Sequence, residues 1–271
     1  MELTVLGRKV HVATGGQPFD AGKPAIVFLH GAGCDHTVWQ LPARWFAWHG
    51  YSVLAPDLPG HGRSEGPPLG ALGDMARWVA ALLDAAGVRQ AALIGHSMGA
   101  AIALEAAAAM PERVTRICLL GTASAVPVNS DLLRTALEEP QRAYQMMTAW
   151  AHASAAKLGG NPVPGLWMTG GTLALFARNQ PGVLYTDLAA CNAWTTGADA
   201  ARGLRCPALV LVAANDIMTS AKSGRELAAL IPGGRLVTIP DCGHMLLAEA
   251  PDGVLDALTA FIPAAHEPGA G

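Results

Sequence analysis

Short apolar runs alternate with amphipathic stretches along most of the chain, and this pattern predicts strands that alternate with helices. Eight segments are expected as strands: Glu2–Leu6, Lys9–Ala13, Ala25–Leu29, Ser52–Ala55, the run that begins at Ala91, Val114–Leu120, Ala208–Ala213 and Arg235–Ile239. The central runs are almost wholly apolar, as expected for strands buried on both faces of a parallel sheet. Because helices separate the strands, the crossovers are right-handed, and we predict an α/β fold with a mostly parallel eight-stranded sheet flanked by helices.

The helices are predicted from apolar residues that recur on one face of each segment. They are expected near 42–48, over 73–87, directly after Ser97, over 220–231 and near 252–262. The first of them carries Leu41, Trp45 and Trp48 on one face. Each of these helices follows a strand and is expected to cover one face of the sheet.

The alternation stops between Thr122 and Gly203, where helical patches occur without a convincing buried strand. The patches lie near 131–137, 141–158, 172–177 and 182–193. Soft and aromatic side chains are frequent here: Met146, Met147, Trp150, Trp167, Met168, Phe176, Tyr185 and Trp194. They suit a lid over an apolar pocket, although we expect most to form the insertion's own core and about a third to face a ligand. We therefore predict a core at 1–121 and 204–263, a helical lid insertion at 122–203 and a flexible tail at 264–271.

The composition fits one large α/β domain and gives no sign of a charged polymer as partner. Of the 271 residues 51% are hydrophobic and 14% charged, and the formal net charge is −3. Without a run of Lys or Arg there is no electrostatic reason to expect nucleic acid or an anionic membrane. The first dozen residues alternate like a strand, so no signal peptide is predicted. Five widely spaced cysteines without a C-x-x-C pair favour neither a disulfide framework nor a zinc site, and a reduced, cytoplasmic location is the default expectation.

The sequence Gly95-His96-Ser97-Met98-Gly99 stands between a predicted strand and a predicted helix. A serine in G-x-S-x-G at such a junction is typical of a nucleophile elbow, a tight turn that lifts the hydroxyl clear of the sheet. The turn needs a strained backbone at Ser97, and the two glycines leave room where a side chain would collide with a neighbouring strand or helix. The alternative is a glycine-bearing turn that matches the pattern by chance. An acid and a histidine later in the chain decide between the two interpretations.

His244 is the candidate base among nine histidines, because it directly follows the last predicted strand. In a parallel sheet all strands end at the same edge, so this loop can approach Ser97. Asp216 follows the preceding strand at that edge and is the candidate acid. Three other acids are set aside because they cap a turn or lie in the insertion: Asp241, Asp187 and Asp199. The other histidines are expected to be structural or exposed; they include His30, His61, His96 and His152.

The order of Ser97, Asp216 and His244, together with four loop motifs, makes the chain resemble the α/β-hydrolase superfamily over nearly its whole length. The motifs are HGAG after the third strand, DLPGHGRS after the fourth, GHSMG at the fifth and CGH after the eighth. The resemblance implies an oxyanion hole formed by the backbone N–H groups of Ala32 and Met98. The loop from Asp57 to Ser64 resembles a family loop that we interpret as structural.

The resemblance implies a serine hydrolase, and we expect a carboxylesterase-like enzyme that cleaves a small or hydrophobic ester through an acyl-enzyme. This chemistry needs no cofactor or metal, and the expected partner is a small-molecule ester. Lactonase, thioesterase, C–C-bond hydrolase and cofactor-free perhydrolase or haloperoxidase activities use the same triad and stay open. A ligand receptor on a hydrolase scaffold is the alternative from another class. The serine at position 97 disfavours haloalkane dehalogenases and epoxide hydrolases, which carry an aspartate there, and the oligomeric state stays open.

Overall fold

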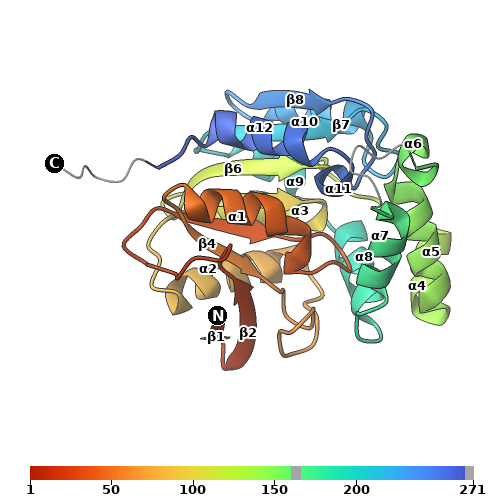
Figure 1. Cartoon of the computed structure of the whole chain (residues 1–271), viewed down its shortest axis with the longest axis horizontal. Coiled ribbons are helices and arrows are strands. Elements are labelled where there is room, and N and C mark those ends of the chain that lie inside the picture. Colours follow the sequence, from red (N-terminus) through yellow and green to blue (C-terminus); the bar gives the residue numbers. More distant parts are fainter. Residues whose placement is uncertain (160–165, 266–271) are drawn as a thin grey trace.

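The computed structural model of the protein describes residues 1–159 and 166–265. Its eight strands form one sheet with the spatial order β1-β2-β4-β3-β5-β6-β7-β8 (Figure 1). The strands are β1 (Glu2–Val5), β2 (Arg8–Ala13), β3 (Ala25–Leu29), β4 (Ser52–Pro56), β5 (Ala91–His96), β6 (Val114–Leu120), β7 (Ala208–Ala213) and β8 (Arg235–Ile239). β2 pairs antiparallel with both β1 and β4, and all other neighbours are parallel. The predicted mostly parallel eight-stranded sheet is therefore confirmed.

Helices cover both faces of this sheet (Figure 1). They are α1 (Gln40–Trp48) and α12 (Pro251–Phe261) on one face, and α2 (Leu72–Ala85), α3 (Met98–Ala109) and α10 (Ala221–Leu230) on the other. Successive side chains of a strand point to opposite faces, so Ile26 and Phe28 of β3 pack with α1 and α12, whereas Val27 and Leu29 pack with α2 and α3. All residues of β3, β4, β5 and β7 are buried, which explains why these strands are apolar apart from Ser52 and His96 at strand ends.

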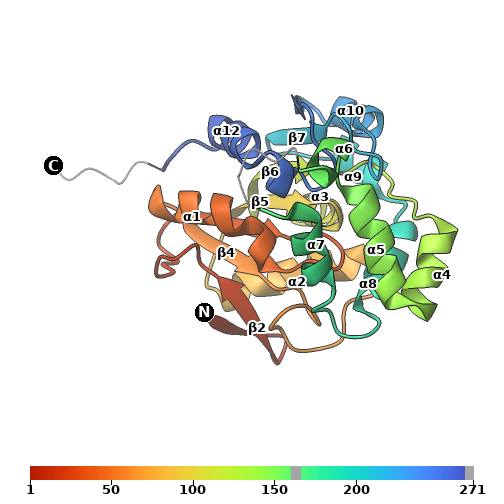
Figure 2. The same ribbon diagram turned by 45° about the vertical axis from the view of Figure 1, so that its right-hand side comes forward.

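A set of helices lies between β6 and β7; Figure 1 shows α4, α5, α7 and α8 grouped at one end of the molecule, and Figure 2 turns this end toward the viewer. In the described part of this insertion the helices are α4 (Ser130–Glu138), α5 (Pro140–Ala151), α6 (Ser154–Lys157), α7 (Met168–Phe176), α8 (Val183–Asn192) and α9 (Gly197–Arg202), and there is no strand. The patch expected at 141–158 is two helices. The first ends before His152, and the main-chain N–H of Ala153 donates instead to the carboxylate of Glu249. The short helix α9 was not expected.

Two further short helices, η1 (His36–Trp39) and α11 (Leu246–Glu249), follow loops at the carboxyl edge of the sheet. None of the helices formed by the described residues is both long and apolar enough to cross a membrane. Residues 266–271 of the tail expected at 264–271 lie outside the described residues.

Candidate active site

The turn at Ser97 joins the end of β5 to the start of α3, and its backbone is strained. Ser97 has a φ of 55° and a ψ of −119°, a conformation that costs a residue with a side chain about 1–3 kcal/mol. A Cβ added to Gly95 would lie 2.2 Å from the carbonyl oxygen of Gly99, and one added to Gly99 would lie 2.1 Å from that of Leu29. Close approach of the main chain therefore requires both glycines.

Three side chains from the carboxyl ends of three strands meet at this turn. The hydroxyl Oγ of Ser97 lies 2.9 Å from Nε2 of His244, and Nδ1 of His244 lies 2.7 Å from Oδ2 of Asp216. Ser97 follows β5, Asp216 follows β7 and His244 follows β8. The structure thus brings together the three residues that the sequence analysis selects as nucleophile, acid and base.

The hydrogen bonds determine which nitrogen of His244 carries a proton. A carboxylate only accepts, so Nδ1 of His244 donates to Asp216 and the lone pair of Nε2 faces the hydroxyl of Ser97. Burial acts to raise the pKa of Asp216, but His244 and the main-chain N–H groups of Met218 and Thr219 outweigh it and lower the pKa below the usual value. Asp216 is therefore an ionised partner for the imidazole at neutral pH.

Two buried side chains hold the loop that carries His244. His96 lies with Nε2 2.8 Å from the carbonyl oxygen of His244, and burial lowers the pKa of His96 to about 3, so its neutral ring donates this bond. Oε2 of Glu249 accepts the main-chain N–H groups of Gly243 and Ala153, each at 3.0 Å. The sequence analysis did not select Glu249, whose only signal is its closeness to His244 in the chain, at the end of the short helix that follows.

The backbone N–H groups of Ala32 and Met98 belong to segments that meet at the same turn. Met98 is the first residue of α3, so its N–H has no acceptor within the helix. A Cβ on Gly31 would lie 3.2 Å from Cβ of Ser97, and Ala32 lines the same cavity as Ser97. Neither N–H donates to any other described residue. Two such donors beside a nucleophile are what an oxyanion hole requires.

A cavity of about 350 Å³ opens beside Ser97, and most of its wall is apolar. The insertion contributes Val126, Pro127, Val128, Asn129, Leu132, Met147, Trp150, Ala151, Phe176, Leu188 and Cys191. Among the described residues no Lys, Arg, Asp or Glu lines this cavity. A second cavity of about 440 Å³ lies between α1 and α7 and does not include Ser97. The cavity beside Ser97 therefore suits an uncharged group.

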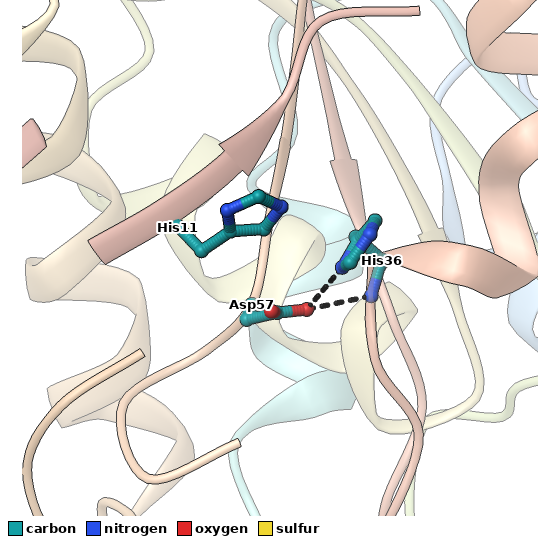
Figure 3. A group of neighbouring side chains, drawn as sticks. All are labelled: His11, His36 and Asp57. Carbon is teal, nitrogen blue, oxygen red and sulfur yellow. Dashed lines mark hydrogen bonds and ion pairs between the residues drawn. The ribbon is translucent and has the colours of Figure 1, made fainter. Parts of the chain in front are cut away.

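His11, His36 and Asp57 are the group of candidate metal ligands that the described residues contain (Figure 3). Their ligand atoms lie within 4.8 Å of one another. Oδ1 of Asp57 accepts the main-chain N–H and the Nδ1–H of His36, at 2.9 and 2.7 Å, and Oδ2 accepts the N–H of Arg63. These bonds outweigh burial and lower the pKa of Asp57 to about 2, and they anchor the loop from Asp57 to Ser64.

Comparison with known proteins identifies the family. The family model of the alpha/beta hydrolase fold matches residues 24–251. RutD of Klebsiella pneumoniae, provisionally named a carbamate hydrolase, is 29% identical over 265 residues, which cover 91% of this chain and 95% of RutD. BpoC of Mycobacterium tuberculosis, provisionally named a non-heme bromoperoxidase, is 29% identical over 251 residues, covering 87% and 92%.

Among solved structures, the enol-lactonase of Burkholderia xenovorans LB400 superposes with a TM-score of 0.86 at 25% identity, covering 97% of this chain and 99% of its own. The likeness extends over the sheet, the flanking helices and the insertion between β6 and β7. Because the family model matches most of the chain and the architecture agrees, the protein is a member of the α/β-hydrolase fold family.

Proposed function

We propose that the protein is a serine hydrolase that cleaves the ester bond of a small molecule through an acyl-enzyme. The observation that carries the proposal is the continuous line of hydrogen bonds from Ser97 through His244 to Asp216, at 2.9 and 2.7 Å. A serine hydroxyl becomes a useful nucleophile when an adjacent base takes its proton and a third group orients that base. Membership of a family of hydrolases supports the same conclusion.

The proposed reaction has two steps. Nε2 of His244 takes the proton of Ser97 while Oγ attacks the carbonyl carbon, and Asp216 stabilises the imidazolium that forms. The N–H groups of Ala32 and Met98 stabilise the negative oxygen of the tetrahedral intermediate, and loss of one such donor typically costs about 100- to 1,000-fold in turnover. The imidazolium then protonates the leaving alcohol, and a water molecule deprotonated by His244 releases the acid from Ser97.

The apolar cavity supports an uncharged acyl group of modest size. Its volume is about 350 Å³, and no cationic side chain of the described residues lines it to pair with a carboxylate on the substrate. Because eleven of its lining residues come from the stretch 122–203, we propose that this stretch is the lid and that 1–121 and 204–263 form the core. All five cysteines are unpaired, which supports a reducing compartment such as the cytoplasm.

A lactone is the second candidate substrate. The enol-lactonase of Burkholderia xenovorans supports it, because that structure matches this chain over nearly its whole length at 25% identity. The same three residues would open a cyclic ester by the same steps, with the leaving alcohol remaining attached to the acyl group. Other activities that use this triad are tested by the same comparison of the wild type with Ser97→Ala. The further substrates are thioesters, carbamates, compounds with a cleavable C–C bond, and peroxide.

The deciding experiment measures hydrolysis of p-nitrophenyl esters from acetate to decanoate by the wild type and by Ser97→Ala. We expect turnover that depends on chain length and falls at least about 1,000-fold in the variant. Ser154→Ala, an exposed serine of α6 outside the cavity, is the matched control and is expected to retain wild-type turnover. The hemisuccinate ester is expected to react more slowly than the neutral butyrate. Equal rates in the wild type and Ser97→Ala on every ester and lactone would refute the proposal and favour a ligand receptor.

A further inference from the structure

The insertion holds both polar groups of one main-chain residue beside the proposed oxyanion hole. Oδ2 of Asp187, in the middle of α8, accepts the N–H of Gly33 at 2.9 Å. Nδ2 of Asn179, from the loop between α7 and α8, donates to the carbonyl oxygen of Gly33 at 2.6 Å. Gly33 directly follows Ala32. We call Asp187, Asn179 and Gly33 the Gly33 clasp.

Gly33 itself shows that the clasp is a close fit. Its φ is +66°, which favours glycine, and a Cβ there would lie 3.0 Å from Cδ1 of Leu184 in α8. The N–H of Cys34 donates to the carbonyl oxygen of Gly31 at 3.1 Å, so residues 31–34 form a tight turn with Ala32 and Gly33 at its centre. The insertion therefore contacts this turn directly rather than only covering the cavity.

A buried histidine fixes the carboxylate of the clasp. Nε2 of His61 lies 2.8 Å from Oδ2 of Asp187, and Nδ1 lies 3.1 Å from the carbonyl oxygen of Pro59. A carbonyl oxygen and a carboxylate only accept, so with Asp187 ionised both ring nitrogens of His61 donate and the two side chains form an ion pair. Burial acts to lower the pKa of His61, but Asp187 outweighs it and the pKa is raised. His61 is 1% exposed and Asp187 is fully buried.

The peptide on the other side of Ala32 is held by the core. The N–H of Leu58 donates to Nε2 of His30 at 3.0 Å, so the proton of His30 is on Nδ1 and is donated to the carbonyl oxygen of Gly31 at 2.9 Å. Burial lowers the pKa of His30 to about 4, which keeps this ring neutral. Thus His30 of the core holds the carbonyl oxygen of the Gly31–Ala32 peptide, which carries the Ala32 N–H. From the insertion, Asp187 holds the N–H of the next peptide, Ala32–Gly33, and Asn179 holds the carbonyl oxygen of the peptide after it.

We propose that Asp187 and Asn179 are positioning residues for the backbone N–H of Ala32, so that the insertion completes the oxyanion hole. This inference rests on the proposed function, in which Ala32 donates to the reacting oxygen. Stability alone explains the ion pair poorly, because replacing a buried ion pair by apolar residues is often neutral or stabilising. The ion pair is explained instead by its effect on Gly33, because a charged acceptor fixes the direction of the Gly33 N–H.

The test compares Asp187→Ala, Asp187→Asn and Asn179→Ala with the wild type in steady-state ester hydrolysis. Loss of an oxyanion donor costs about 100- to 1,000-fold, so a displaced donor is expected to cost up to about 100-fold. We expect kcat to fall about 100-fold in Asp187→Ala and about 10-fold in Asp187→Asn, which keeps an acceptor for Gly33, while KM stays within about threefold. Asn179→Ala is expected to lower kcat about threefold to tenfold.

Arg178→Ala is the matched control. Arg178 forms an ion pair with Asp35 across the same boundary, with 2.6 Å between Nη2 and Oδ2, but it does not contact Gly33. We expect its kcat within twofold of the wild type. A trifluoromethyl ketone gives a second readout, because its adduct with Ser97 places an anionic oxygen at the hole. Its affinity is expected to fall by the same factor as kcat in each variant.

The outcomes separate this inference from the proposed function. If the wild type hydrolyses no ester or lactone, or if Ser97→Ala does not abolish hydrolysis, the proposed function fails. If the wild type is active but the Asp187 variants keep their kcat, or raise only KM, the positioning role is wrong. An equal loss in Arg178→Ala would also overturn it, since general loosening of the insertion would then explain the effect. If the Asp187 variants do not fold, Asn179→Ala decides the question, because Asn179 is only half-buried. An unchanged kcat in this variant would then overturn the positioning role.

Discussion

Two glycines in helices provide a matched pair with opposite expected effects on stability. Helix propensity predicts that Gly→Ala stabilises a helix interior by about 1 kcal/mol, and this gain is an upper limit at Gly99, the second residue of α3. At Gly171 in α7, no atom lies within 4 Å of an added Cβ, so this gain is expected in full. At Gly99 in α3, the added Cβ would lie 2.1 Å from the carbonyl oxygen and 2.5 Å from the carbonyl carbon of Leu29. Non-bonded carbon atoms prefer about 3.5–4.0 Å, and both contacts are with main chain that cannot rotate away.

Overpacking a core costs about 1–3 kcal/mol, and contact with rigid backbone places Gly99→Ala at the upper end. After the propensity gain, the net destabilisation is about 2 kcal/mol, which corresponds to a Tm lowered by about 4–8 °C for a chain of this size. Gly171→Ala is expected to raise Tm by about 2–4 °C. Thermal unfolding followed by circular dichroism measures both. A Gly99→Ala protein as stable as the wild type would show that β3 and α3 are not as close as the structure has them, and the argument for the elbow glycines would fail with it.

Two further predictions concern the buried histidines. Asp216→Asn is expected to lower kcat about 1,000- to 10,000-fold with little change in Tm. An amide can turn its NH₂ group toward Nδ1 of His244 and so favour the tautomer with the proton on Nε2, which cannot accept the proton of Ser97. Steady-state kinetics and thermal unfolding check this prediction, and a loss in kcat below tenfold would contradict it. The second concerns His61, whose pKa in the folded protein is raised above the unfolded value near 6.5. The charged and titratable groups that face it are Asp187, Asp57 and His30. The stability that protonated His61 contributes is fully present below about pH 6.5 and is lost as the pH rises through the raised pKa. The difference in unfolding free energy between the wild type and His61→Gln, measured by urea titration, is therefore expected to shrink from pH 6 to alkaline pH; a constant or growing difference would contradict the assignment.

The sequence predicts the sheet well because its central strands are buried on both faces. The bounds of β3 and β7 agree with those expected, since a strand covered on both sides must be apolar throughout. The bounds of β6 and β8 agree as well, although β8 is an edge strand in which only Ile239 is buried. Helix faces are predicted less well. Leu41 and Trp48 of α1 are 53% and 58% exposed, whereas the smaller Ala43 and the neighbouring Phe46 are buried. The face that a helix buries depends on what lies opposite it, and that information is not local.

In the candidate site, too, some residues can be predicted from local sequence and others depend on contacts between distant segments. Ser97, Asp216 and His244 could be selected from sequence because each follows a strand of one parallel sheet, and the structure brings their side chains together. Their catalytic roles, and those of the Ala32 and Met98 N–H groups, stay predictions. Asp187 could not be selected, because its partners Gly33 and His61 are 154 and 126 residues away and no local pattern marks it. Contacts between the insertion and the sheet produce no periodic pattern in the sequence from which they could be predicted.

The Gly33 clasp limits how far the insertion can be treated as an exchangeable part. The segment between β6 and β7 is continuous in the chain and contributes most of the cavity wall, so it is the natural unit to transplant between relatives when a new substrate range is wanted. A transplanted segment that lacks an acid and an amide at the positions of Asp187 and Asn179 would leave both polar groups of Gly33 without their present partners. If the clasp has the proposed positioning role, such a chimaera is expected to lose rate on every substrate alike, a loss easily mistaken for a poorly shaped pocket. Restoring those two side chains first separates the chemistry from the choice of substrate.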